Sequence, residues 1–223
     1  MSVNYHAFQC RGFLFDEYEA HKEHWLAFFQ NYDPRRVVHI LGLTADEDYL
    51  YLSYYQTPYR MRLVDGTLEK KINGEWSSRL YFNEAMVCYH LLHYVKDTPM
   101  LTGAWTPNTA LDGIISRTEP QHDPLFAPFE KRFTGRIAQL EALCKRLGGV
   151  RQDKGDLCYE FEAFPQVHLQ VLFYDADEDF PAQVKVLVDR HVTDYIHFET
   201  TGCLISDLFE KIEQMDDAEA NNG

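Results

Sequence analysis

The densest group of carboxylates in the sequence is an acidic turn from Asp175 to Asp179. Asp175, Asp177 and Asp179 alternate along it, and Asp189 follows at the far end of the next apolar segment. Carboxylates at such spacing can hold a hard cation such as calcium or magnesium, or raise one another's pKa for acid–base chemistry. The same pattern suits a solvated hairpin turn whose charges aid solubility and block edge pairing. The spacing lacks the glycine and closing glutamate of an EF-hand loop. Three alternatives therefore stay open: a solvated turn, a carboxylate cluster for acid–base chemistry, or a metal site formed by Asp175, Asp177, Asp179 and Asp189.

A long connection without hydrophobic periodicity, residues 96–123, supplies a second candidate site. A run of this length inside a compact domain is usually functional or mobile. Trp105 stands beside threonines and a proline, so its ring could cap a pocket for a flat ligand or simply anchor the loop onto the core. Loops carry binding residues more often than sheets do. The predicted ligand-binding residues are Thr102, Trp105, Arg117 and His122.

Two pairs of histidines have the spacing that places both rings on one helix face. His21 and His24 form one pair, and His90 and His93 form the other. Residues three apart on a helix can chelate a metal ion. No third ligand is evident near either pair, and a hydrogen-bonded core histidine explains His93 as well. Both interpretations stay open.

A further group combines acids and histidines after the last predicted strand: Asp189, His191, Asp194, His197 and Glu199. It could line a site at the end of a sheet, or it could cap a helical turn with its histidines on the surface. The sequence has no G-x-S-x-G elbow, no phosphate-binding P-loop and no G-x-G-x-x-G fingerprint. No cysteine stands out as a nucleophile.

The elements that must position these residues follow from hydrophobic periodicity. Helices are predicted at residues 16–29, 34–42, 83–95 and 201–215, and a long helix is predicted from about residue 124 or 128 to residue 147. Strands are predicted at residues 49–55, 59–64, 159–163, 167–174 and 184–189, with turns at Asp65-Gly66 and Asn73-Gly74. The fold class is α+β, with an N-terminal antiparallel meander and a three-stranded C-terminal hairpin sheet packed with several helices. Residues 1–215 are expected to form a single domain or two subdomains that meet near residues 96–123. Residues 216–223 are expected to form a disordered acidic tail.

Several segments of the chain carry a family resemblance. They are Phe164-Pro165, the acidic turn with Phe180-Pro181, Leu187 to Asp189, His90 to Val95, Thr102-Gly103 with Trp105, and the glycines of Gly148-Gly149 and Gly155-Asp156. With these residues the chain resembles the family called domain of unknown function 3786, from about residue 18 to about residue 212. That family has no established activity, so the resemblance implies no reaction. Some relatives carry an iron–sulfur cysteine segment or occur in anaerobes with corrinoid-dependent one-carbon metabolism, and this chain has no such cysteine segment.

Composition and charge limit the classes of partner. The chain has 223 residues, 45% hydrophobic and 25% charged, as is ordinary for a soluble globular protein. Its formal net charge of −14 argues against nucleic acid or an anionic membrane, because phosphates repel an acidic surface. No apolar run approaches the roughly 18 residues of a membrane span. The N-terminal residues lack the features of a signal peptide.

The five cysteines are isolated from one another: Cys10, Cys88, Cys144, Cys158 and Cys203. Iron–sulfur and structural zinc sites need closely spaced thiolates, so neither is expected from the cysteines alone. The pattern fits reduced, mostly buried thiols in a cytoplasm. The sequence identifies no cofactor.

These observations favour a cytoplasmic, non-enzymatic or accessory protein that binds a small ligand or a protein partner. The first alternative is a metal-dependent enzyme that uses residues 175–179 with nearby histidines. The second is a structural module whose sheet face or long connection meets another protein. The sequence does not indicate the ligand, a reaction or the oligomeric state.

Overall fold

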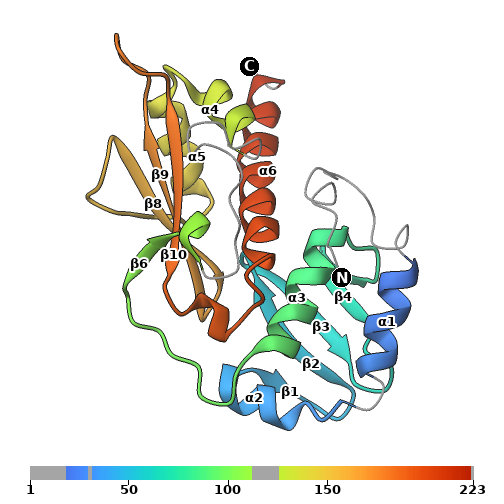
Figure 1. Cartoon of the computed structure of the whole chain (residues 1–223). Helices are drawn as coiled ribbons and strands as arrows, with labels where there is room; N and C mark the ends of the chain where they lie inside the picture. The colour runs from blue at the N-terminus through green and yellow to red at the C-terminus, as the bar shows by residue number, and fades with distance from the viewer. Residues whose placement is uncertain (1–18, 30–31, 112–125, 222–223) are drawn as a thin grey trace.

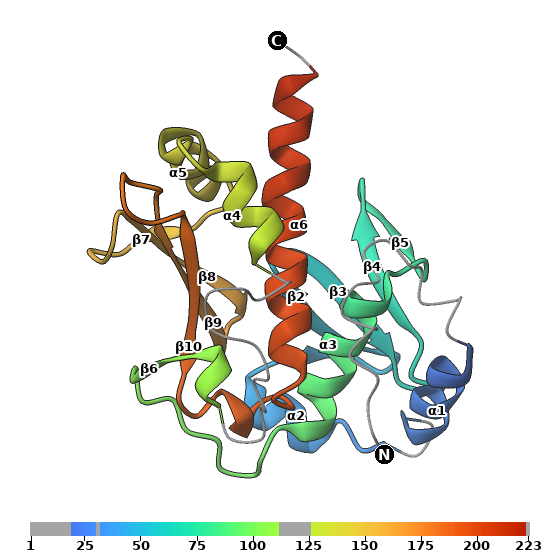
Figure 2. The same ribbon diagram turned by 45° about the horizontal axis from the view of Figure 1, so that its top comes forward.

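A computed structural model describes residues 19–29, 32–111 and 126–221, and the side chains of residues 19–22 and 26 lie outside that description. It shows two five-stranded antiparallel sheets on either side of one long helix, α6 (Thr200–Ala220). Figures 1 and 2 both show α6 between the two sheets. The predicted α+β class is confirmed. No helix among the described residues has the length and apolar character needed to cross a bilayer.

The N-terminal sheet is a meander with its strands in chain order. They are β1 (Thr44–Ala45), β2 (Tyr49–Tyr54), β3 (Thr57–Arg62), β4 (Leu68–Ile72) and β5 (Glu75–Ser77). Alternate residues of β2 are buried, as the period of two along a strand requires. The turns predicted at Asp65-Gly66 and Asn73-Gly74 are confirmed as the connections on either side of β4. The β2–β3 turn was not predicted, because Tyr55 and Gln56 both adopt positive φ, 43° and 61°, without glycine.

Three helices accompany this sheet: α1 (Glu19–Phe29), α2 (Arg35–Leu41) and α3 (Phe82–Tyr94). Gly42 ends α2 in the left-handed conformation, with φ of 61°. Helix α3 is buried around much of its circumference, as its apolar sequence predicts. It lies between the meander and α6 (Figure 2).

The C-terminal sheet has the strand order β6-β10-β9-β8-β7. Its strands are β6 (Trp105–Pro107), β7 (Val150–Arg151), β8 (Leu157–Phe164), β9 (Val167–Tyr174) and β10 (Gln183–Asp189). The three central strands confirm the predicted hairpin sheet, whereas β6 and β7 are additional edge strands. Strand β6 comes from the connection that the sequence pattern leaves without structure, and there Trp105 pairs with Asp189. Short 3₁₀ turns, η3 (Asn108–Ala110) and η4 (Val192–Asp194), follow β6 and β10.

The single helix predicted from about residue 124 or 128 to residue 147 is wrong: residues 124 and 125 lie outside the described part of the chain, and the rest forms two helices, α4 (Ala127–Phe133) and α5 (Ile137–Arg146). Gly135 separates them with φ of 70°, a conformation that ends helices. Its backbone N–H donates to Asp175 Oδ1 at 2.8 Å. The apolar stripe continues across the break because Phe133 of α4 and Leu140 of α5 both enter the same core.

Helix α6 also differs from its predicted length. It extends to Ala220, so residues 216–220 are helical where the sequence suggests a disordered tail. The reason is a tertiary contact: Asp216 is 4% exposed and accepts hydrogen bonds from Arg132 Nε at 2.8 Å and Arg136 Nη2 at 2.7 Å. Two arginines from α4 and the start of α5 thereby hold the last turns of α6.

Candidate functional site

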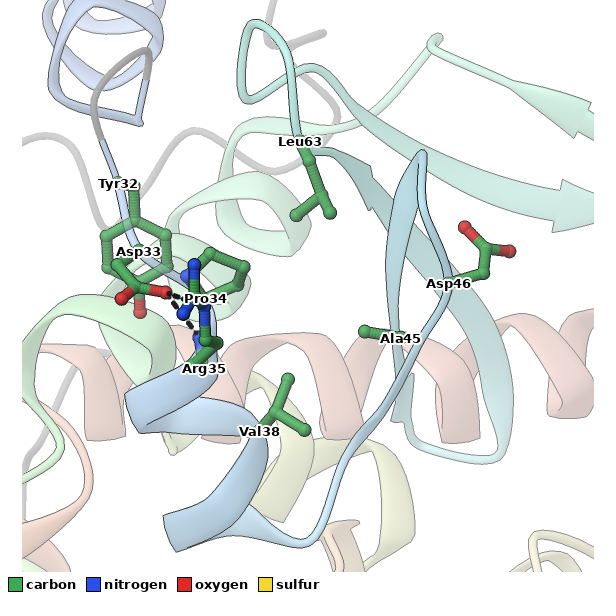
Figure 3. Close-up of a pocket in the computed structure, with 8 residues that line it drawn as sticks. All are labelled: Tyr32, Asp33, Pro34, Arg35, Val38, Ala45, Asp46 and Leu63. Atoms are coloured by element: carbon green, nitrogen blue, oxygen red, sulfur yellow. Dashed lines mark hydrogen bonds and ion pairs between the residues drawn. The ribbon is translucent and has the colours of Figure 1, made fainter.

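A surface pocket with a volume of about 560 Å³ lies between α2 and the edge of the N-terminal sheet. Figure 3 shows the side chains of Val38, Ala45 and Leu63 pointing toward one another across it, with Asp33 and Asp46 on opposite sides. Its lining consists of Tyr32, Asp33, Pro34, Arg35, Val38, Ala45, Asp46 and Leu63. Three separate chain segments supply these residues, so the pocket exists only in the folded protein.

The α2 side of the pocket is held by local and distant contacts. Tyr32 Oη donates to the carbonyl of Leu92 in α3 at 2.8 Å. Burial raises the pKa of Tyr32 well above its usual value, so the phenol stays neutral. The backbone N–H of Arg35 donates to Asp33 Oδ1 at 3.0 Å, which orients this carboxylate at the start of α2.

The opposite side of the pocket is fixed by the carboxylate of Asp46. Its Oδ1 accepts the N–H groups of Asp48 and Tyr49 at 2.9 and 2.7 Å, and its Oδ2 accepts Tyr51 Oη at 2.6 Å. The hydrogen bond from Tyr51, followed by those from the backbone, lowers the pKa of Asp46. Asp46 is therefore ionised at neutral pH. The pocket lining contains two carboxylates and one guanidinium, so the pocket carries a net negative charge.

The predicted ligand-binding residues are only partly described. Thr102 and Trp105 lie close to Asp189: the backbone N–H of Thr102 donates to Asp189 Oδ2 at 3.0 Å, and Trp105 is the strand partner of Asp189. Trp105 is half-buried, and Lys154 Nζ lies 6.0 Å from the centre of its ring. Arg117 and His122 lie outside the described residues.

Asp189 itself joins the long connection to the end of β10. It is 7% exposed and accepts hydrogen bonds from the N–H groups of Gly103 at 2.7 Å and His191 at 2.8 Å, in addition to that of Thr102. The carboxylate of Asp189, which the sequence suggests as a metal ligand, is therefore hydrogen-bonded to backbone N–H groups.

The acidic turn forms at the other end of the same strand. Asp177 Oδ1 accepts the N–H groups of Asp179 and Phe180, both at 2.8 Å, which is the bonding of an aspartate-stabilised turn. Strand β10 separates this turn from Asp189 by roughly 20 Å at 3.3 Å per residue. The structure therefore brings Asp175, Asp177 and Asp179 into one turn and leaves Asp189 apart. Within the described part of the chain, no three histidine, cysteine, aspartate or glutamate side chains are arranged to hold a metal ion.

Replacing Asp177 by alanine is expected to lower the free energy of unfolding by about 1 kcal/mol, since two backbone donors of the turn lose their acceptor. The loss should be the same with calcium, with magnesium and with a chelator. Thermal unfolding of both proteins under the three conditions measures it. Glu178→Ala, in the same turn, is the control. A loss that appears only in the presence of a divalent ion would instead identify a cation site.

Histidines from separate segments meet where α1, α3 and the start of α6 come together. The ring of His90 lies 5.3 Å from that of Trp25 and 6.2 Å from that of His197, measured between centroids. Its Nδ1 is 2.5 Å from Thr200 Oγ1. Burial, followed by repulsion from His197 and His93, lowers the pKa of His90 to about 3. His90 is therefore a neutral, hydrogen-bonded and partly buried residue at physiological pH.

The other histidines and acids of the sequence analysis are distributed among separate contacts. Burial, followed by repulsion from His24, lowers the pKa of His93. Asp194 binds Lys96 Nζ at 2.5 Å and the N–H of Met100 at 3.1 Å. His197 Nδ1 lies 3.5 Å from Glu199 Oε2. The side chain of His21 lies outside the described residues.

Sequence patterns did not identify the pocket beside α2. The Asp33-Pro34 pair and Gly42 indicate where a short helix begins and ends, but Ala45 and Leu63 become its neighbours only when the meander folds. No local sequence pattern predicts that these two residues lie next to α2.

Comparisons with known proteins identify a family and no activity. No curated protein and no solved structure matches the chain significantly. A family model described as "Domain of unknown function (DUF3786)" matches residues 33–210, which is well over half of the chain. The matched segment begins at the pocket and ends within α6, so it spans both sheets. The chain therefore belongs to the DUF3786 family.

Proposed function

We propose that this chain is a cytoplasmic, non-enzymatic accessory protein that binds a small molecule in the pocket beside α2. The observation that carries the proposal is the pocket itself: its volume of about 560 Å³ falls within the range of roughly 300–1,000 Å³ typical of small-molecule sites. Apolar side chains face one another across it and a few oriented polar groups stand at its sides, which is the usual composition of such a site.

The charge of the pocket favours one class of ligand. Its carboxylates, Asp33 and Asp46, outnumber its one guanidinium, that of Arg35. An anionic ligand would be repelled, whereas an uncharged or cationic molecule with an apolar body would contact Val38 and Leu63 and place its polar end beside a carboxylate. The overall charge of −14 likewise disfavours nucleic acid as a partner.

The state of the ionisable groups supports binding rather than catalysis. A general base works best when its pKa lies near the operating pH. The pKa of Asp46 is lowered instead, and hydrogen bonds from its own turn and from Tyr51 engage both of its oxygens. The four described cysteines are free and buried, as is usual for cytoplasmic proteins, and Cys10 lies outside the described residues.

A ligand screen with pocket variants tests the proposal. Uncharged and cationic small molecules are added, and melting temperatures are recorded for the unmodified protein and for Val38→Trp, which fills the pocket. A ligand at 100 times its Kd adds about 2.7 kcal/mol, so we expect it to raise the melting temperature by about 5–10 °C in a chain of this length. Val38→Trp should abolish the shift.

Two control variants locate the site. His39→Trp changes an exposed residue of the same helix outside the pocket lining, and it should leave the ligand-induced shift intact. Trp105→Ala tests the site predicted in the long connection. If Trp105→Ala abolishes the shift and Val38→Trp does not, the binding site lies at the connection instead. If no compound of either class raises the melting temperature, the proposed function is wrong.

A further inference from the structure

The carboxyl group of Asp207 is buried where α6 passes the N-terminal sheet. The residue is 8% exposed. Its Oδ2 accepts a hydrogen bond from Tyr54 Oη of β2 at 2.8 Å, and its Oδ1 accepts one from Asn83 Nδ2 of α3 at 2.9 Å. One side chain therefore connects three elements that are far apart in the sequence.

The groups around Asp207 are mainly neutral or negative. On α3, the carboxylate of Glu84 raises the pKa of Asp207, although Lys70 of β4 binds Glu84 at 2.7 Å. The thiol of Cys88, also on α3, faces Asp207 as well. On the sheet, Tyr55 and Tyr59 face it together with Tyr54. On α6 itself, Cys203 faces it, and Lys211, one turn further on, lowers its pKa. Among the described residues, no cation lies within ion-pair distance of Asp207.

This environment stabilises the protonated form. Removing a carboxylate from water is costly unless a cation compensates for its charge. Burial accordingly raises the pKa of Asp207 to about 7, and the hydrogen bonds from Asn83 and Tyr54 offset only part of that effect. The proposed small-molecule pocket involves none of these groups.

The two sides of α6 differ in how they are held. Toward the C-terminal sheet, Phe209 stacks on Phe129 with their ring centres 4.1 Å apart, and Asp216 binds two arginines. Toward α3 and the N-terminal sheet, the described polar contacts of α6 include those of Asp207, the hydrogen bond from Tyr55 Oη to the carbonyl of Leu204 at 2.9 Å, and the contact of Thr200 Oγ1 with His90 Nδ1 at 2.5 Å. Ionisation of Asp207 therefore acts on the contacts of α6 with β2 and α3 and not on those of Phe209 and Asp216.

We propose that Asp207 makes a proton-dependent contact that holds α6 against β2 and α3 while its carboxyl is protonated, and that loss of this proton loosens α6 from the N-terminal sheet. The pKa of Asp207 is raised in the folded protein above its ordinary value of 3.8. The stabilisation is thus fully present below pH of about 4 and is lost as the pH rises to about 7, beyond which it changes little.

Hydrogen exchange gives the decisive measurement. Amide protection in residues 201–212 and in β2 is measured between pH 5 and pH 8, after correction for the intrinsic pH dependence of exchange. The pKa of Asp207 is about 7 in the folded protein and 3.8 when the group is exposed to water. Linkage between these two values predicts that the equilibrium constant for opening rises about 100-fold from pH 5 to pH 8. In Asp207→Asn, whose amide resembles the protonated carboxyl, this rise should be absent.

Two further measurements keep the test independent of how well one variant folds. In the unmodified protein, the ¹³C resonance of the Asp207 carboxyl should titrate near pH 7, and Tyr54→Phe, which removes a donor to the carboxylate, should move that midpoint upward. Asp216→Asn, on the same helix, should still show the change in amide protection between pH 5 and pH 8. A carboxyl that titrates below pH 5 would overturn the proposal. Equal changes in protection in the unmodified protein and in Asp207→Asn would overturn it as well.

Discussion

Replacing Phe209 by alanine is expected to lower the free energy of unfolding by about 3–5 kcal/mol. The side chain is fully buried in α6, and its ring stacks on that of Phe129 in α4 at an interplanar angle of 19°. Truncation removes this contact and leaves a cavity that the surrounding helices can fill only in part. Equilibrium unfolding in urea, followed by circular dichroism, measures the loss.

Phe28 supplies the matched control for this change. It is 40% exposed on α1, so Phe28→Ala should cost less than about 1 kcal/mol. Phe209→Leu, which keeps most of the buried volume, should cost clearly less than Phe209→Ala. A loss of under 1 kcal/mol for Phe209→Ala would show that α6 does not form the shared core described above.

Replacing Lys70 by methionine is expected to cost about 3 kcal/mol, the lower end of the range for buried pairs, because the change breaks a largely buried ion pair and leaves one charge behind. Lys70 Nζ lies 2.9 and 2.7 Å from the two carboxylate oxygens of Glu84, and the side chains are only 12% and 13% exposed. Glu84 also accepts the N–H of Tyr81 at the start of α3. The remaining carboxylate would therefore keep one backbone donor but lose its cation. Urea unfolding at pH 7 measures the difference.

The double variant Lys70→Met/Glu84→Gln separates loss of packing from the cost of an unpaired charge. It should recover much of the stability lost in Lys70→Met, since no buried charge remains. The exposed pair of Lys145 and Glu141 on α5 is the control: its side chains are 61% and 38% exposed, so Lys145→Met should change stability by less than about 0.5 kcal/mol. If the double variant loses as much stability as Lys70→Met and Glu84→Gln lose together as single variants, the two side chains do not form the ion pair assigned here.

Local sequence signals predict the elements that repeat a clear pattern. Helix α3 follows from its apolar sequence, the central strands β8, β9 and β10 follow from their apolar alternation, and two turns of the meander follow from Asp65-Gly66 and Asn73-Gly74. The two-residue strands β1 and β7 are too short to show a period of two. The break at Gly135 was missed because the apolar stripe continues through it.

Contacts between distant residues account for the features that sequence could not predict. The final turns of α6 look like an acidic tail until Arg132 and Arg136 are placed beside Asp216. From sequence, Asp189 resembles a metal ligand. Its partners are the backbone N–H groups of Thr102 and Gly103, and a backbone donor cannot be predicted from the type of side chain. The pocket beside α2 depends in the same way on the folded meander.

The position of α6 also has a consequence for protein synthesis. The helix completes the interior on both of its sides, yet its residues, 200–220, are made after both sheets. A ribosome adds residues from the N-terminal end, and domains generally fold once their full set of contacts is available. Residues 19–199 must therefore leave the ribosome with two apolar surfaces still uncovered. We expect this interval to be the period when the nascent chain depends most on chaperones.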